Sequence, residues 1–178
     1  MSQMHQIQMS YVSTEDRILF RLNTKSRQEF RFWLTRRYTG ILWNTLARIL
    51  DEAGKGAKGA PPVPVQDELV KSAEKEIEHK KAVAEGDFDT AYEESSYLPL
   101  GEQPTLLFSV GVKPGPNSQA MLCMHPEDGE GIELVLNEQI VHSLCKLIVD
   151  TAGKAEWNLS LTFGSELPDG KEPPTGLN

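Results

Sequence analysis

Residues 20–50 read FRLNTKSRQEFRFWLTRRYTGILWNTLARIL, and residues 122–152 read LCMHPEDGEGIELVLNEQIVHSLCKLIVDTA. At a constant offset of 102 residues, the two stretches carry apolar side chains at matching positions, so that Phe20 falls on Leu122. Each stretch begins with two alternating segments, typical of half-buried strands, and continues with the spacing of an amphipathic helix. Similarity at a fixed offset indicates a repeated structural unit. We therefore expect two similar units, each with strands followed by a helix.

Polar residues and glycines mark where each predicted helix begins and ends. Thr35 and Asn137 stand directly before the two helical patterns, and their side chains can accept a hydrogen bond from an N–H of the first turn. Gly54 and Gly153 follow the patterns and favour helix ends. Only two of the 31 aligned positions are identical, so the repeat predicts buried faces and does not establish common ancestry.

The fold class predicted from these patterns is α+β, with antiparallel sheet or sheets covered by helices on one face. The two similar β-β-β-α units are joined by a Gly/Pro-rich linker and a charged helix, and together they form one compact domain. A further alternating strand is expected over residues 157–163. The expected division is 1–53 for the first unit, 54–104 for the linker with its helix at 66–86, 105–164 for a second β-β-β-α-β unit, and 165–178 for a disordered tail.

Composition limits the classes of protein to consider. The chain has 178 residues, of which 39% are hydrophobic and 25% charged, as in globular proteins. No apolar run approaches the roughly 20 residues of a membrane-spanning helix, and the first ten residues do not resemble a signal peptide. Two cysteines predict no disulfide framework. We expect a cytoplasmic protein that does not enter a membrane.

The charge is divided unevenly along the chain. Residues 1–58 hold ten Lys/Arg and five Asp/Glu, whereas residues 59–178 hold eight and twenty-one, and all seven arginines lie in the first part. Such asymmetry indicates either an anion-binding face in the first unit or complementary surfaces that attract each other or a partner. We favour complementary surfaces because they require fewer assumptions.

A basic and aromatic surface is the first candidate binding site. Its side chains are expected to point away from the buried face of the first unit, and they are Arg17, Arg21, Arg31, Trp33, Arg36 and Arg37. Arg and Trp are enriched at protein interfaces, which favours contact with a protein partner or with a second copy of the chain. The same side chains could bind single-stranded nucleic acid by phosphate contacts and base stacking.

The topology, with a sheet and a helix given twice, resembles the repeats of the PUR and Whirly-type single-strand binders. This resemblance implies nucleic-acid binding through the outer sheet face. Those repeats have four strands before the helix, whereas three are expected here, and no sequence motif is shared. The second unit replaces the basic positions with residues such as Cys123 and Glu133, so such a surface would belong to one unit only.

The second candidate is a zinc site formed by Cys123, His125, His142 and Cys145. Two cysteines and two histidines form a common tetrahedral zinc set. However, the repeat places Cys123 and His125 on the outer sheet face, whereas His142 and Cys145 belong to the following helix. We therefore expect the two pairs to lie on opposite sides of the sheet, and we expect no cofactor.

Sequence motifs of enzymes are lacking. The glycines at 54, 56 and 59 precede prolines and do not form a phosphate-binding loop between a strand and a helix. The chain contains neither Gly-x-Ser-x-Gly nor His-Glu-x-x-His. We interpret the chain as a non-catalytic adaptor or regulatory protein that acts through its outer sheet face. The alternative is single-stranded nucleic-acid binding by the first unit.

Overall fold

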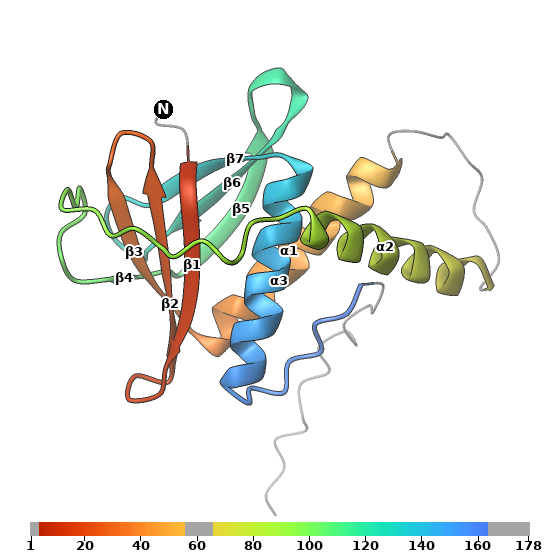
Figure 1. Ribbon diagram of the computed structural model, residues 1–178, viewed down its shortest axis with the longest axis horizontal. Helices are drawn as coiled ribbons and strands as arrows, with labels where there is room; N and C mark the ends of the chain where they lie inside the picture. Colours follow the sequence, from red (N-terminus) through yellow and green to blue (C-terminus); the bar gives the residue numbers. More distant parts are fainter. Residues whose placement is uncertain (1–3, 56–65, 164–178) are drawn as a thin grey trace, which may run out of the picture.

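The computed structural model describes residues 4–55 and 66–163, and within them the chain is an α+β protein with two sheets (Figure 1). The first sheet has the order β1-β2-β3-β4 and the second the order β5-β6-β7. The strands are β1 (Met4–Val12), β2 (Arg17–Thr24), β3 (Glu29–Leu34), β4 (Thr105–Leu106), β5 (Ser109–Pro114), β6 (Ala120–His125) and β7 (Ile132–Leu136). The helices are α1 (Arg36–Lys55), α2 (Gln66–Ala84) and α3 (Glu138–Lys154), with a 3₁₀ turn at Pro116–Ser118.

Antiparallel hairpins form the body of each sheet. Phe20 of β2 lies opposite Phe32 of β3, and Leu122 of β6 lies opposite Leu134 of β7. These four side chains belong to the hydrophobic core. Since side chains alternate along a strand, the residues between them define an opposite, outer face on each sheet.

The segment between residues 105 and 114 forms two short strands, whereas the expected second unit begins at residue 105 with one. Its first part, β4, pairs in parallel with β3 of the first sheet, whereas its second part, β5, pairs with β6 of the second sheet. Leu107 between them is buried, and its N–H donates to the carbonyl of Trp33 at 3.0 Å. The N–H of Phe108 donates to the carbonyl of His125 at 2.9 Å. The chain thus passes from one sheet to the other around a buried leucine.

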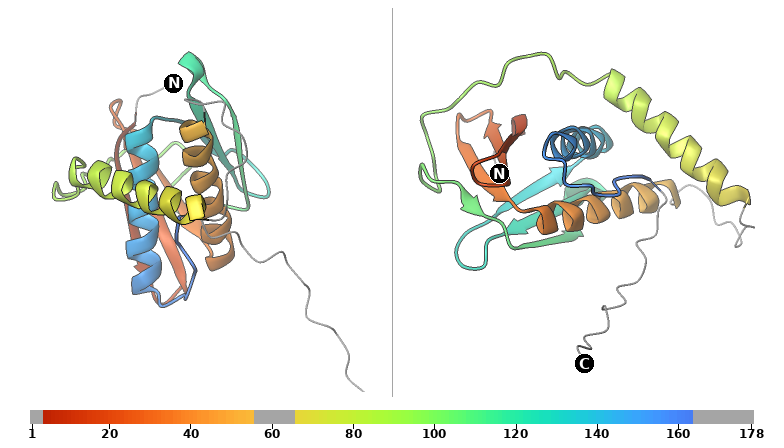
Figure 2. Two further views of the ribbon diagram at one scale, coloured as in Figure 1. Left: turned by 90° about the vertical axis from the view of Figure 1, so that its right-hand side faces the viewer. Right: turned by 90° about the horizontal axis from the view of Figure 1, so that it is seen from below.

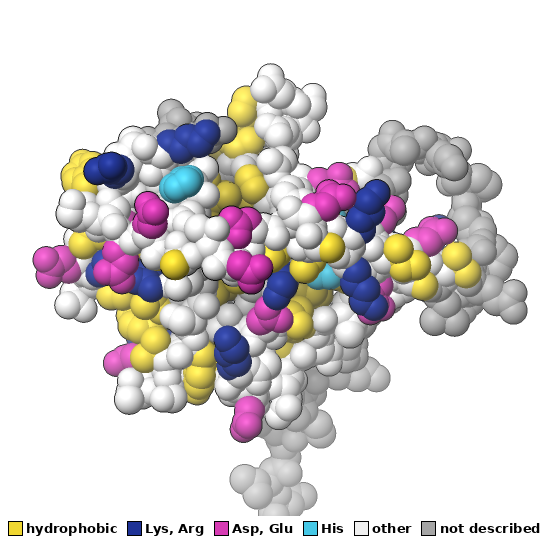
Figure 3. All heavy atoms as spheres, viewed as in Figure 1, with side chains coloured by type: hydrophobic (Ala, Val, Ile, Leu, Met, Phe, Trp, Pro, Cys, Tyr) yellow, Lys and Arg dark blue, Asp and Glu magenta, His cyan; other side chains and the backbone are white. Residues whose placement is uncertain are grey.

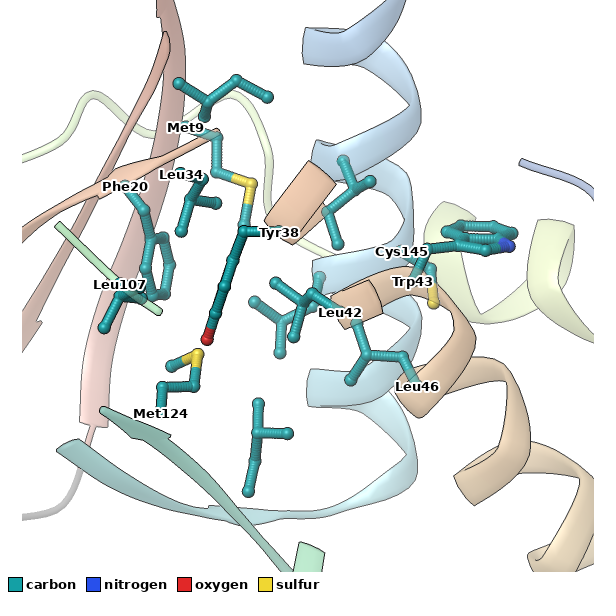
Figure 4. Packing of buried hydrophobic residues seen from close by; sticks show 14 of the residues in the cluster. Met9, Phe20, Leu34, Tyr38, Leu42, Trp43, Leu46, Leu107, Met124 and Cys145 are labelled. Atoms are coloured by element: carbon teal, nitrogen blue, oxygen red, sulfur yellow. The ribbon is translucent and has the colours of Figure 1, made fainter. Parts of the chain in front are cut away.

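The core lies where the two sheets meet α1 and α3. The two helices contact each other, and each also contacts the first strand of the other half, α1 with β5 and α3 with β1 (Figure 2). Tyr38 and Leu42 of α1 point between Phe20 of the first sheet and Met124 of the second (Figure 4). One continuous core therefore joins both halves.

The expected helix caps are confirmed. The hydroxyl of Thr35 accepts a hydrogen bond from the N–H of Tyr38 at 3.1 Å, and the side chain of Asn137 accepts one from Ile140 at 2.8 Å. The charged helix expected at 66–86 corresponds to α2, which lies across α3 (Figure 1). The linker residues 56–65 and the tail from residue 165 lie outside the described residues.

The strand expected over residues 157–163 is absent, and that prediction is wrong. The segment has no strand partner; instead Trp157 is buried and its ring packs edge-on against Tyr11. The ring of Phe163 packs on Trp43 of α1. Asn158 adopts a positive φ of 51°, which interrupts the extended backbone. The alternating apolar residues therefore reflect packing over other elements rather than pairing in a sheet.

None of the helices in the described part of the chain is long and apolar enough to span a membrane.

Shortening a core side chain should destabilise the whole protein, because both halves share one core. Phe20→Ala removes a fully buried ring and should lower the free energy of unfolding by about 3–5 kcal/mol. Phe108→Ala is the matched control, since 59% of Phe108 is exposed, and it should change stability by no more than about 0.5 kcal/mol. Urea unfolding followed by circular dichroism measures both. Equal effects would contradict the assignment of the core.

Candidate interaction surface

The chain between α2 and β4 runs across the outer face of the first sheet (Figure 1; Figure 2, right). We call residues 87–97 the acidic strap, since they read DFDTAYEESSY. The strap ends beside β3, where Tyr97 forms a parallel bridge with Gln28. The outer face that the sequence presents as a candidate binding surface is therefore partly occupied by the chain itself.

Amides of the sheet hold the middle of the strap. The side chain of Gln6 donates to the carbonyl of Ala91 at 3.1 Å and accepts from the N–H of Glu93 at 3.0 Å. The side chain of Asn23, which is buried, donates to the carbonyl of Glu93 at 2.8 Å. These bonds satisfy backbone groups of the strap in the way that a neighbouring strand would.

Arg21 is the second anchor of the strap. Its guanidinium donates to Gln8 on the neighbouring strand and to the Glu94 carboxylate of the strap at 2.5 Å. The same group lies over the ring of Tyr92, 4.9 Å from the ring centroid. Burial raises the pKa of the Tyr92 hydroxyl. Arg21 is thus already paired with an anion and with an aromatic ring.

Glu29 is the third anchor and is almost completely buried, with 1% of its surface exposed. One carboxylate oxygen accepts a hydrogen bond from Arg31 at 2.7 Å, and the other accepts one from the N–H of Ser95 in the strap, also at 2.7 Å. The backbone N–H of Glu29 donates to the carbonyl of Tyr97 at 2.9 Å. The hydrogen bond to Glu29 raises the pKa of Arg31, whose guanidinium stays charged.

The outer face beyond the strap is apolar. Leu19, Trp33 and Leu106 are direct neighbours across β2, β3 and β4, and we call them the apolar row. Leu19 and Trp33 are half-buried, and 42% of Leu106 is exposed. Figure 3 shows acidic and basic side chains together along the strap and hydrophobic side chains on the same face below it.

The six residues of the basic and aromatic surface are thus separated into three pairs. Arg21 and Arg31 bind carboxylates beneath the strap. Arg17 and Trp33 lie on the outer face beyond it, and Arg36 and Arg37 are exposed at the start of α1.

Sequence reasoning missed Glu29 and the strap. The acidic and aromatic composition of residues 87–97, read against the arginines of the first unit, was the signal that could have found them.

The four predicted metal ligands are not brought together. Cys123 and His125 lie on β6, where their neighbour is Glu133; among the described residues this is the one group of three metal-ligand side chains whose atoms lie within 4.8 Å of one another. Cys145 is buried in α3, and burial raises its pKa to about 12. His142, also on α3, contacts His79 instead.

His79 of α2 and His142 of α3 form a close pair, and the ring of Phe163 packs against His79. Their Nδ1 atoms are 3.0 Å apart, so one ring donates a hydrogen bond to the other. Burial lowers the pKa of both rings, and the neighbouring His142 lowers that of His79 further. Both imidazoles are therefore neutral in the folded protein, and the hydrogen bond between them joins α2 to α3.

Comparison with protein-family models, with curated proteins and with solved structures finds no match to this chain. Charged groups beneath the strap bind each other, and the apolar row lies beyond the strap with Arg17 on the same face of β2.

Removing the charge of Glu29 should weaken the strap. In Glu29→Gln, Arg31 loses its buried carboxylate, and the free energy of unfolding should fall by about 1–3 kcal/mol. Glu94→Gln is the matched control, because it removes the other ion pair of the strap at a carboxylate that is 65% exposed, and it should cost no more than about 1 kcal/mol. Urea unfolding measures both variants. If Glu94→Gln proved the more damaging, Glu29 would not be the main anchor.

Acid should weaken the contact between α2 and α3. The pKa of both histidines is lowered by folding, so the unfolded chain binds more protons as the pH falls below about 6.5, and stability is lost there. Neighbouring charges also act on the two imidazoles. Glu76 partly offsets the lowered pKa of His79, and Lys146 lowers it further. Glu138 and Glu78 partly offset the lowered pKa of His142.

The measurement is the urea midpoint at about pH 5 and about pH 7.5. The double variant His79→Gln/His142→Gln should show a smaller difference between the two midpoints than the unmodified protein. His5→Gln, at an exposed histidine, should behave like the unmodified protein. An unchanged pH dependence in the double variant would contradict the role of the pair.

Proposed function

We propose that this protein is a non-catalytic adaptor or regulatory protein that binds a protein partner through the outer face of its first sheet. The observation that carries the proposal is the division of this face. The strap occupies the polar part, whereas the apolar row of Leu19, Trp33 and Leu106 has no described segment bonded across it. The proposal places the protein in the cytoplasm, where its two free cysteines would stay reduced.

The composition of the open part supports contact with a protein. Trp and Arg contribute most often to the binding energy of protein interfaces, and here Trp33 lies at the centre of the row. Arg17 lies two residues before Leu19 on the same face of β2. A partner with apolar side chains beside one or more carboxylates fits this arrangement, and a second copy of the chain is one candidate.

The alternative, single-stranded nucleic acid, is less well supported. Arg21 and Arg31, which would contact phosphates, are paired with Glu94 and Glu29. The acidic strap also places negative charge over that part of the face, which opposes a phosphate backbone. We therefore favour a protein partner and treat nucleic-acid binding as an outcome of the test.

We also propose that the two halves are structural copies, with their helices covering one face of each sheet. The register supports this, since Phe20–Phe32 and Leu22–Phe30 correspond at the offset of 102 residues to Leu122–Leu134 and Met124–Ile132. The reciprocal contacts of α1 with β5 and of α3 with β1 support an approximate twofold relation. The outer faces of the two copies differ, so the two halves would bind different molecules.

Site-specific photo-crosslinking tests the proposed surface. A photoreactive amino acid in place of Leu106 should form a discrete crosslinked product, whether with a second copy in the purified protein or with one partner in cells. The matched control carries the same amino acid at Ile77, which is exposed and lies on α2, outside the first sheet. It should give no such product. Trp33→Glu should abolish the product at Leu106 while leaving the circular dichroism spectrum unchanged.

Three outcomes separate the possibilities. A crosslink between copies, with a mass in light scattering above the 19.8 kDa of the single chain, identifies self-association. A crosslink to one other protein identifies an adaptor. No product at Leu106, together with salt-dependent binding of a labelled single-stranded oligonucleotide that Arg17→Glu removes, would overturn the proposal in favour of nucleic acid.

A further inference from the structure

The outer face of the second sheet brings a thiol, an imidazole and a carboxylate together. Cys123 of β6 lies directly opposite Glu133 of β7, and His125 follows two residues later on the same face of β6. The ligand atoms of the three side chains all lie within 4.8 Å of one another. This group differs from the four residues that the sequence suggests, because Glu133 takes part and the residues of α3 do not.

The spacing suits a small divalent ion. Zinc binds thiolate sulfur at about 2.3 Å and carboxylate oxygen at about 2.1 Å, so a tetrahedral site separates these two atoms by about 3.6 Å. The Sγ atom of Cys123 and an Oε1 atom of Glu133 are 3.8 Å apart. Binding would therefore require only small side-chain movements.

The backbone around the group is closely packed. Cys123 and Glu133 lie inside two strands that pair along their length, and Gly131 lies against His125. A Cβ atom at Gly131 would lie 2.5 Å from Nδ1 of His125 and 2.1 Å from the carbonyl oxygen of Met124. The turn before β7 can approach the imidazole so closely only because residue 131 is glycine.

The neighbouring strand leaves room for a fourth ligand. Gly111 of β5 lies directly opposite Cys123 on the other side of β6, and no atom lies within 4 Å of the position that its Cβ would occupy. Cys123 and His125 are half-buried rather than sealed. A water molecule could therefore reach an ion bound by the three side chains, as in zinc sites with an open position.

Lys113 provides the charge that an ion would replace. Its ammonium group binds the Glu133 carboxylate at 2.5 Å, and the Sγ atom of Cys123 lies 3.8 Å from that carboxylate and equally far from the carbonyl oxygen of Met121. Lys113 lowers the pKa of Glu133 and, by its charge, acts against the effect of burial, which raises the pKa of Cys123. An ion of charge +2 would displace this ammonium group, and the thiol would release its proton to solvent.

We propose that Cys123, His125 and Glu133 bind a zinc-type divalent cation, with water in the fourth position and Lys113 as the competing cation. Thiolate and imidazole ligands together favour zinc over magnesium or calcium, which prefer oxygen ligands. This site lies on the second sheet and is independent of the apolar row on the first.

Cobalt(II) titration of the purified full-length chain without a histidine tag tests the proposal. One equivalent should produce a thiolate-to-cobalt charge-transfer band, and zinc should remove it by competition. Cys123→Ser should abolish the band, and His125→Asn and Glu133→Gln should each weaken binding by at least about tenfold. Cys145→Ala is the matched control and should keep both the band and the affinity, because Cys145 is buried in the core.

The variant Lys113→Met distinguishes metal binding from a purely structural role of these residues. Removing the competing ammonium group should tighten cobalt binding by about two- to fivefold, the equivalent of one surface ion pair. Circular dichroism checks that every variant is folded. The proposal would be overturned if the unmodified protein gave no charge-transfer band, if the band survived in Cys123→Ser, or if Lys113→Met weakened binding.

Discussion

The buried carboxylate of Glu29 is the contact on which the arrangement of the outer face depends. A buried carboxylate is stable only when both of its oxygens accept hydrogen bonds. One oxygen of Glu29 accepts a hydrogen bond from Arg31 of the same strand, and the other accepts one from the backbone N–H of Ser95 in the strap. The strap is therefore bound where the sheet needs a donor. Its position in turn decides which side chains of the first sheet stay open, since Arg21 and Arg31 are occupied beneath it and Trp33 lies beyond it.

The ion pairs beneath the strap explain part of the unequal distribution of charge along the chain. Within the part of the chain that the structure describes, Arg21 and Arg31 form ion pairs with carboxylates, one of which belongs to the acidic strap, so part of the asymmetry is neutralised within the molecule. The second half has no equivalent strap over its outer face among the described residues, and the charged groups there, Lys113 and Glu133, bind each other directly. The outer face of the first sheet thus carries an apolar row beyond its strap, whereas that of the second presents a small cluster of metal-ligand groups.

Local patterns predicted the strands, the caps and both core helices well, because alternation and helical spacing follow directly from burial of one face. The same patterns failed at residues 157–163, where alternation arises from rings packed on Tyr11 and Trp43, and at residues 105–114, where one apolar run serves two sheets. The site was harder to predict. The outward positions of Arg21 and Trp33 follow from alternation, but the anchoring of residues 91–97 joins segments some 70 residues apart, which no local period encodes.

The passage of the chain around Leu107 joins the two sheets directly. β4 completes one sheet and β5 begins the other, so that only Leu107 and Phe108 lie between them, and the leucine is buried. The same short stretch of backbone runs from Leu106, which pairs with Trp33, to Gly111, which lies next to Cys123. The proposed partner surface and the proposed metal site therefore lie at the two ends of one short connecting segment.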